Sequence, residues 1–307
     1  SKKGNGVLRE GVEMKYAWIE QHKDSYPVKT MCRVLEASKS AYYAWRKRTP
    51  GPRQLRSQRI HQSVKRVHED SDHIYGSYKI ADQLSKDPKL ETACRNTVAK
   101  AMKEMKLKSR VSKRFKPTTT ITDPSKKPAD NILNQVFEAD APNQKWVTDI
   151  TYLPLVSGFV YLAVVLDLFS RKVVGWKLSD NLATPLVSSA LRDAIDKRKP
   201  RTSDLLLHSD RGCQYTSDEY QTQLRTMSIT CSMSRTGCCY DNAVMERFFW
   251  SLKHEWTKFE SFENIDQVRA SVFKYIETFY NRKRIHQSLE YLSPEQFEEK
   301  HAEQLAA

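Results

Sequence analysis

The sequence of 307 residues lacks any apolar run that approaches the roughly 20 residues needed to cross a bilayer. Its first residues, SKKGNGVLRE, also lack the apolar core of a secretory signal. The six cysteines include no Cys-x-x-Cys pair, which argues against a zinc site and against a disulfide framework in a chain of this size. The sequence contains no internal repeat. These absences predict a cytoplasmic protein with reduced thiols and no membrane partner.

Positive charge is abundant but unevenly distributed. The formal net charge is +14, and residues 1–128 hold 30 Lys and Arg against 13 Asp and Glu. Residues 129–307 hold the remaining 21 basic and 24 acidic residues. A basic half joined to a near-neutral half is typical of a module that grips nucleic acid, attached to a second domain. A general solubilising excess of charge is the alternative.

The first 48 residues predict short helices. In the stretch VKTMCRVLEASKSAYYAWRKR, Met31, Val34 and Leu35 share one helical face, and Ser38 is placed to cap the next helix. A helix, a short break and a helix with a basic end are typical of a helix-turn-helix, although any small helical bundle gives a similar pattern. The residues at that basic end that we expect to contact DNA are Arg46, Lys47 and Arg48.

A second helical DNA-binding domain is expected over residues 53–107, after a linker at 49–53. Helices are predicted over 60–69, 75–87 and 93–107, with Val98, Met102 and Met105 facing inward on the last one. Residues 108–135 are basic, rich in Thr and interrupted by Pro, which predicts a linker that can lie along a phosphate backbone.

After residue 136 the hydrophobic period changes from helical to extended. Strands are predicted at 144–155, 158–170 and 171–180, then a helix at 184–197, a strand at 204–212, a helix at 218–227 and a strand at 229–234. This order is that of the ribonuclease H-like fold. We therefore predict an α/β catalytic domain over 136–300, with a mixed five-stranded sheet flanked by helices and preceded by all-α helix-turn-helix domains.

Three acidic residues lie where a carboxylate needs a partner. Asp149 interrupts a strand, Asp210 ends one, and Glu246 lies on a helix that Phe248, Phe249 and other aromatics anchor in the core. Each alone is weak, since a strand-end Asp is more often a turn residue and most helix glutamates are solvated. Together, with 35 residues between Asp210 and Glu246, they predict a catalytic triad that binds Mg²⁺ or Mn²⁺. Two such ions could activate a nucleophile in phosphodiester displacement.

The sequence allows two interpretations for several residues expected near the triad. Lys253 either contacts DNA phosphate or is a surface lysine, and His208 either orients an active-site carboxylate or is a core histidine. Asn242 is placed to cap the Glu246 helix and to meet DNA. Asp167 is a rival carboxylate, for which a structural role is favoured. The residues of a basic cluster in the C-terminal part that we expect to contact phosphate are Arg282, Lys283, Arg284 and His286.

Four ordered motifs carry a family resemblance: VTDITYLP, HSDRGCQYTS, SMSRTGCCYDNAVMERFF and YNRKRIHQSLEYLSPEQF. Together they resemble the second reading frame of bacterial insertion-sequence transposases of family three and, more distantly, the retroviral integrase core. The resemblance covers residues 12–300 and implies that Asp149, Asp210 and Glu246 form an Asp-Asp-Glu triad. Cys213, Cys238 and Arg247 depart from residues common in the family, but no triad carboxylate is lost.

The resemblance also implies an activity and partners. Family members hydrolyse the 3′ ends of the element, and the freed 3′-OH attacks another phosphodiester. The partners would be double-stranded DNA of the terminal inverted repeats and of the target, a second copy of the chain, and the helix-turn-helix protein of an upstream frame. The start SKKGNG is interpreted as the seam of such a frameshift fusion or as a trimmed end. The alternatives are a nuclease of the same fold without strand transfer and an inactive, transposase-derived repressor.

Overall fold

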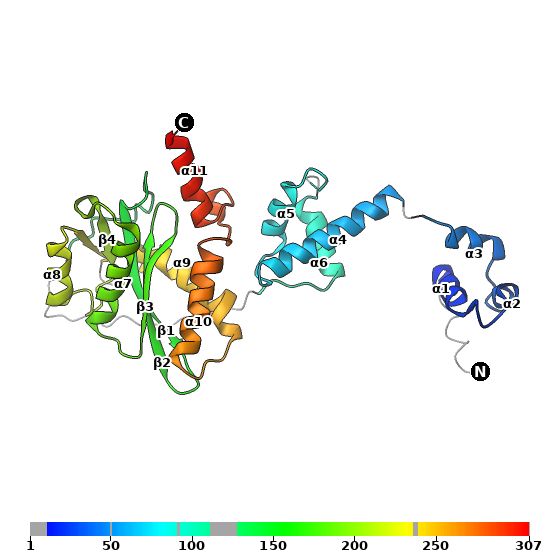
Figure 1. Cartoon of the computed structure of the whole chain (residues 1–307), viewed down its shortest axis with the longest axis horizontal. Helices are drawn as coiled ribbons and strands as arrows, with labels where there is room; N and C mark the ends of the chain where they lie inside the picture. Colours follow the sequence, from blue (N-terminus) through cyan, green and yellow to red (C-terminus); the bar gives the residue numbers. More distant parts are fainter. Residues whose placement is uncertain (1–10, 50, 91–92, 111–127, 236–238, 307) are drawn as a thin grey trace. The chain divides into compact units, whose positions relative to one another are not determined.

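The computed structural model describes residues 11–49, 51–90, 93–110, 128–235 and 239–306 (Figure 1). The chain divides into two compact units, Ser1–Gln62 and Ser63–Ala307. Within the described ranges no helix combines the length and the apolar character that a membrane span requires. Most of the predicted basic linker, residues 111–127, and Cys238 lie outside the described residues.

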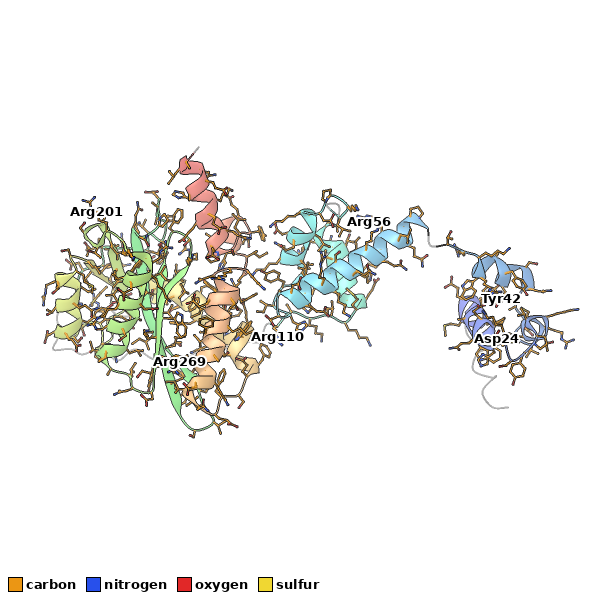
Figure 2. The ribbon with its side chains drawn as sticks, viewed as in Figure 1. Asp24, Tyr42, Arg56, Arg110, Arg201 and Arg269 are labelled. Atoms are coloured by element: carbon orange, nitrogen blue, oxygen red, sulfur yellow. The ribbon has the colours of Figure 1, made fainter. Side chains whose placement is uncertain are left out.

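The first unit contains three short helices, α1 (Val12–His22), α2 (Val28–Val34) and α3 (Lys39–Arg46). Tyr42 is fully buried and lies among the three helices, as Figure 2 shows. The predicted cap of α3 is confirmed, because the Ser38 hydroxyl accepts a hydrogen bond from the Ala41 amide at 3.3 Å. Of the three residues expected to share one helical face, Met31 and Leu35 are buried, whereas Val34, the last residue of α2, is 60% exposed, so the shared face is wrong for Val34.

The second helical region contains α4 (Pro52–Asp70), α5 (Ser77–Ser85) and α6 (Arg95–Glu104). Helix α4 begins at Pro52, inside the predicted linker and well before residue 60, because Pro is readily accommodated in the first turn of a helix. The boundary between the two compact units falls inside this helix, after Gln62. Val98 and Met102 of α6 are buried, as expected.

A five-stranded mixed sheet forms the centre of the following region. Its strands are β1 (Lys145–Pro154), β2 (Phe159–Asp167), β3 (Val173–Ser179), β4 (Leu206–Ser209) and β5 (Thr230–Met233). Their order in the sheet is β3-β2-β1-β4-β5. The first three strands form an antiparallel meander, whereas β4 runs parallel to β1 and β5 runs parallel to β4. The predicted ribonuclease H-like sheet, with the first and fourth strands adjacent, is confirmed.

Helices cover both faces of the sheet (Figure 1). On one face α7 (Thr184–Arg198) and α8 (Asp218–Thr226) enclose a core with sheet residues such as Trp146 and Leu207. Gly175 of β3 allows α7 to pack closely, because a Cβ there would lie 2.5 Å from the Ala190 carbonyl oxygen. On the other face lies α10 (Ile265–Phe273).

The chain then continues through α9 (Ala243–Ser251) directly into a π-helical turn, Leu252–Trp256. A second π-helical turn, Lys274–Tyr280, follows α10, and α11 (Pro294–Ala306) ends the described chain. The two π-helical turns meet through aromatic rings: Trp256 lies 5.4 Å from Tyr275 and 5.7 Å from Phe279 between centroids. This aromatic layer fixes the end of the segment that begins with α9.

Candidate active site beside β1 and β4

The register of two parallel strands brings Asp149 and Asp210 together. Val147 of β1 pairs with His208 of β4, and each aspartate follows its member of that pair by two positions. Because side chains alternate between the two faces of a sheet, both carboxylates project to the same face at neighbouring positions. The predicted proximity of these two residues therefore has a direct structural basis.

Short backbone hydrogen bonds hold each aspartate. Asp149 Oδ1 accepts a hydrogen bond from the Ile150 amide at 2.8 Å, and Asp210 Oδ1 accepts one from the Gly212 amide at 2.9 Å. A Cβ on Gly212 would approach Asp210 Oδ1 to 3.1 Å. Glycine therefore lets the chain leave β4 without pressing on the carboxylate.

Helix α9 brings Glu246 to this region. Met245, Phe248 and Phe249 are buried, and the Phe248 ring meets the Tyr280 ring edge-on at 4.9 Å. Glu246 is exposed and lies at the flank of this buried face, about 100° around the helix from Met245. The expected anchoring of α9 by its aromatic residues is thus confirmed for Phe248 and Phe249, whereas Trp250 is half-buried and stacks on His254.

The carboxylates repel one another. Burial raises the pKa of Asp149 well above its ordinary value of 3.8, and the charges of Asp210 and Glu246 raise it further. Burial also raises the pKa of Glu246. Negative charge in this region is therefore unfavourable in free energy, and a bound cation would reduce that cost.

Lys253 is the cation whose charge acts on Asp149. Burial lowers the pKa of Lys253 to about 8, against the opposing effect of Asp149. Its ammonium lies 4.5 Å from the centroid of the Tyr152 ring. Lys253 is thus half-buried near Asp149, over the Tyr152 ring, and is not a free surface lysine.

The carboxylate oxygens of the triad suit a hard divalent cation, although the three side chains are not gathered around one point. Among the described residues, no three His, Cys, Asp or Glu side chains are gathered closely enough to hold a metal ion. The triad offers only carboxylate oxygens, which favour Mg²⁺ or Mn²⁺ over zinc. Glu246, whose charge already acts on Asp149, would have to come closer to the two aspartates to complete a metal site.

His208 is a core histidine. Its Nδ1 lies 2.9 Å from the Ser232 hydroxyl and its Nε2 lies 3.1 Å from the Ser234 hydroxyl. Burial lowers the pKa of His208 to about 4, so the ring is neutral. Since both ring nitrogens are occupied by serines, the alternative in which His208 orients an active-site carboxylate is wrong.

Asn242 occupies the cap position of α9 but does not cap the helix. Its side chain makes no cap hydrogen bond, and its amide nitrogen instead approaches the Thr148 carbonyl oxygen at 3.5 Å. The side chain is 6% exposed, and its Oδ1 is buried without a hydrogen-bond partner. The predicted cap is wrong, and the predicted DNA contact is contradicted by burial against β1.

Asp167 has the structural role that the sequence favoured. It is fully buried and accepts hydrogen bonds from the amides of Asn143 and Phe169, at 2.8 and 2.9 Å. Burial raises the pKa of Asp167 to about 6, and Arg198 lies 3.7 Å away. Asn143 lies just before β1, Phe169 just after β2 and Arg198 at the end of α7, and none of these contacts involves the triad.

The basic cluster of the C-terminal part does not present all of its residues to solvent. Arg284 is 5% exposed and forms an ion pair with Glu255 at 2.6 Å, so its predicted phosphate contact is wrong. His286 is half-buried, and burial together with the charge of Arg284 holds its pKa well below 6.5. As a neutral ring it brings no positive charge to the predicted phosphate contact, which stays a prediction for His286. Arg282 and Lys283 are exposed and remain predicted DNA contacts.

The basic end of α3 also remains a prediction. Arg46, Lys47 and Arg48 are all exposed, and Arg46 lies 3.4 Å from Glu20. An ion pair of this exposed kind contributes little to stability and leaves the guanidinium accessible to phosphate.

Two residues with clear contacts were not anticipated. Tyr152 supplies the ring beneath Lys253, and its place in the β-strand pattern DITYLP gave no sign of this contact. Tyr75 hydrogen-bonds the Lys283 carbonyl across 208 residues of sequence. No local pattern could indicate such a distant pair.

Comparison with known proteins shows which protein-family models match this chain. Two models described as integrase core domains match residues 139–239 and 227–294, and a model of an HTH-like domain matches residues 55–115. The HTH-like match confirms the helix-turn-helix character expected of the second helical region. The integrase-core matches agree with the order of strands in the sheet.

Curated relatives cover nearly the whole chain. Transposase InsF for insertion sequence IS3A of Escherichia coli (strain K12) is 41% identical over 289 residues, which are 94% of this chain and 99% of the relative. The insertion element IS600 uncharacterized 31 kDa protein of Shigella sonnei is 35% identical over 90% of this chain and 100% of its own length. Among solved structures, the HTLV-2 integrase catalytic core domain in complex with magnesium (trimeric form) matches with a TM-score of 0.41 at 18% identity, covering 52% of this chain and 98% of that one. This structural likeness is weak, and the fold assignment depends on the sheet and the family models.

Proposed function

The chain belongs to the IS3 family of insertion-sequence transposases, and we propose that it cleaves the 3′ ends of an insertion sequence and joins them to another phosphodiester. The observation that carries this proposal is the register of β1 and β4, which sets Asp149 beside Asp210. Glu246, on the helix that follows, supplies the third carboxylate. The nucleophile would be water in cleavage and the freed 3′-OH in strand transfer.

The metal part of the proposal follows from the donors. When bound, a pair of Mg²⁺ or Mn²⁺ ions would activate the attacking oxygen and stabilise the leaving oxygen. Asp149 would hold such ions from β1 and Asp210 from the position directly after β4, whereas Glu246 would complete the site from α9. Lys253, which acts on Asp149, is placed to contact the phosphate that lies next to the carboxylates.

The DNA part of the proposal follows from charge and from the helical regions. The excess of basic residues lies in residues 1–128, which include the HTH-like match, so we assign recognition of the terminal inverted repeats to this half. Exposed Arg46, Lys47, Arg48, Arg282 and Lys283 would contact phosphates. Two element ends must be held together during transfer, which favours at least a dimer. DNA binding would place the protein on the nucleoid.

The experiment combines the chain with terminal-repeat DNA, target DNA and Mg²⁺. Nicked and joined strands that disappear in Asp210→Ala would support the proposal. Nicking without joining would favour a nuclease of the same fold, and DNA binding without any cleavage would favour a repressor. Activity that survives Asp210→Ala or Glu246→Gln would rule out the triad.

A further inference from the structure

A buried ion pair lies at the end of the segment that carries Glu246. Arg284 donates through Nε to Glu255 Oε2 at 2.7 Å and through a terminal nitrogen to Glu255 Oε1 at 2.6 Å. The side chains are 6% and 7% exposed, respectively. A planar guanidinium that grips a carboxylate at two points fixes both distance and orientation.

The pair holds the segment that presents two proposed active-site residues. Glu255 lies in the π-helical turn that continues α9, and this turn also carries Lys253. Arg284 further donates to the hydroxyl of Ser251, the last residue of α9, at 3.2 Å. Arg284 therefore bridges the junction between α9 and its π-helical turn. Because π-helical geometry is rare and is seldom stable by itself, such a junction needs a tertiary partner.

Tyr75 in turn holds the backbone on both sides of Arg284. Its hydroxyl donates to the Lys283 carbonyl at 2.8 Å and accepts from the Ile285 amide at 3.0 Å. Tyr75 is 5% exposed and lies just before α5, within the residues that match the HTH-like domain. A single phenol from the helical region thus fixes the turn from which Arg284 reaches Glu255.

The charge states agree with this arrangement. Burial acts to raise the pKa of Glu255, but the charge and hydrogen bonds of Arg284 outweigh it and the pKa is lowered, so the pair is ionised. Burial raises the pKa of Tyr75 to about 12, so its hydroxyl keeps the proton that it donates.

We propose that Arg284 and Tyr75 are positioning residues that connect the HTH-like region to the active site. Tyr75 sets the turn 283–285, Arg284 sets the α9 junction through Glu255 and Ser251, and that junction sets Glu246 and Lys253. The inference rests on the proposed function for the roles of Glu246 and Lys253. It assigns Arg284 an internal task in place of the DNA contact that the sequence suggested.

Tyr75→Phe tests the chain of contacts with the least disturbance, because it removes one oxygen and keeps the ring. The matched control is Tyr78→Phe, three residues away, whose side chain is 60% exposed. In the full chain with terminal-repeat DNA and Mg²⁺, Tyr75→Phe should lower the turnover of 3′-end cleavage by about 10- to 100-fold with unchanged DNA affinity. Tyr78→Phe should leave both quantities unchanged.

Hydrogen exchange supplies a readout that does not depend on activity. In the chain without DNA, Tyr75→Phe should speed the exchange of backbone amides over residues 243–256, and Tyr78→Phe should not. Arg284→Lys should speed this exchange more strongly, since lysine keeps the positive charge but cannot form the bidentate hydrogen bonds to Glu255. Faster exchange in this segment would support the inference even if the wild-type chain cut no DNA, a result that would overturn the proposed function alone.

Two results would overturn the inference. One is a Tyr75→Phe chain whose cleavage turnover and exchange over 243–256 match those of Tyr78→Phe. The other is a Tyr75→Phe chain that loses DNA affinity at unchanged turnover, because Tyr75 would then serve DNA binding and not the position of Glu246. If Arg284→Lys fails to fold, the Tyr75 and Tyr78 pair still decides between these outcomes.

Discussion

Two clusters of charge around the same sheet are built in opposite ways. In the first cluster, Glu298 of α11 accepts two hydrogen bonds from Arg198 at the end of α7, at 2.8 and 2.9 Å, and one from the Ser170 hydroxyl at 2.7 Å. Burial acts to raise the pKa of Glu298, yet Arg198 and Lys172 outweigh it and the pKa is lowered. At the proposed active site, burial and neighbouring carboxylates both raise the pKa of Asp149.

The difference separates charge that stabilises the fold from charge that is held for a ligand. In the Glu298 cluster, which we define as Glu298, Arg198, Lys172 and Ser170, the one carboxylate has cationic partners that compensate its burial. At the triad, the charge of Lys253 lowers the pKa of Asp149, but burial and the other two carboxylates outweigh it. Carboxylates that repel one another lower the stability of the folded protein. A function that requires these carboxylates explains why the chain retains them.

The largest expected effect is the loss of catalysis from a change in the triad. Asp210→Ala should lower 3′-end cleavage on the order of 10³-fold or more, because one donor of the proposed metal site is gone. The melting temperature should stay the same or rise, since a repelling charge is removed. Cleavage assays and thermal denaturation check both parts, with the exposed Asp180→Asn as the control. A large fall in melting temperature would contradict this prediction, because the triad carboxylates would then stabilise the fold as the Glu298 cluster does.

The reverse pattern is expected in the compensated cluster. Arg198→Met leaves Glu298 buried without its principal partner and should lower the free energy of unfolding by about 3–5 kcal/mol. Cleavage per folded molecule should change little. Denaturant titration and cleavage rates measured on the same samples check this. An unfolding free energy within error of wild type would show that Glu298 is held by Lys172 and Ser170 alone.

A third variant lies between these extremes. Lys253→Gln should lower cleavage by about 10- to 100-fold, because a cation beside the reacting phosphate is lost. DNA affinity should fall much less, since many other basic residues contact the backbone. Turnover and DNA affinity measured separately distinguish the two. A variant that loses only affinity would make Lys253 an ordinary phosphate contact.

The same contrast explains what the sequence could and could not predict. The order of elements along the chain follows from local hydrophobic periods, and the Asp149–Asp210 pair follows from the ribonuclease H-like fold that this order indicates. Arg284 was misassigned because a basic run looks the same whether its members face solvent or a buried carboxylate 29 residues away. Asn242 stands at the cap position, as its type suggests, but the close approach of β1 draws its amide to Thr148. Contacts between distant segments decided both cases.

The smallest expected effect concerns acid stability beside the Arg284–Glu255 pair. His286 is kept neutral by burial and by the charges of Arg284, Lys79, Arg171 and Arg247, so its pKa in the folded chain lies well below 6.5. The unfolded chain binds a proton at His286 below that pH and the folded chain does not. His286 therefore contributes stability that is present above pH 6.5 and is lost as the pH falls.

The loss should amount to at most about 1.4 kcal/mol per pH unit. Carboxylates also titrate in this range, so the measurement is the difference in unfolding free energy between wild type and His286→Phe, followed from neutral pH to mild acid. Wild type should lose stability faster than the variant on acidification. A constant difference would mean that His286 is protonated equally in both states, and the basic turn would then tolerate a second cation beside Arg284.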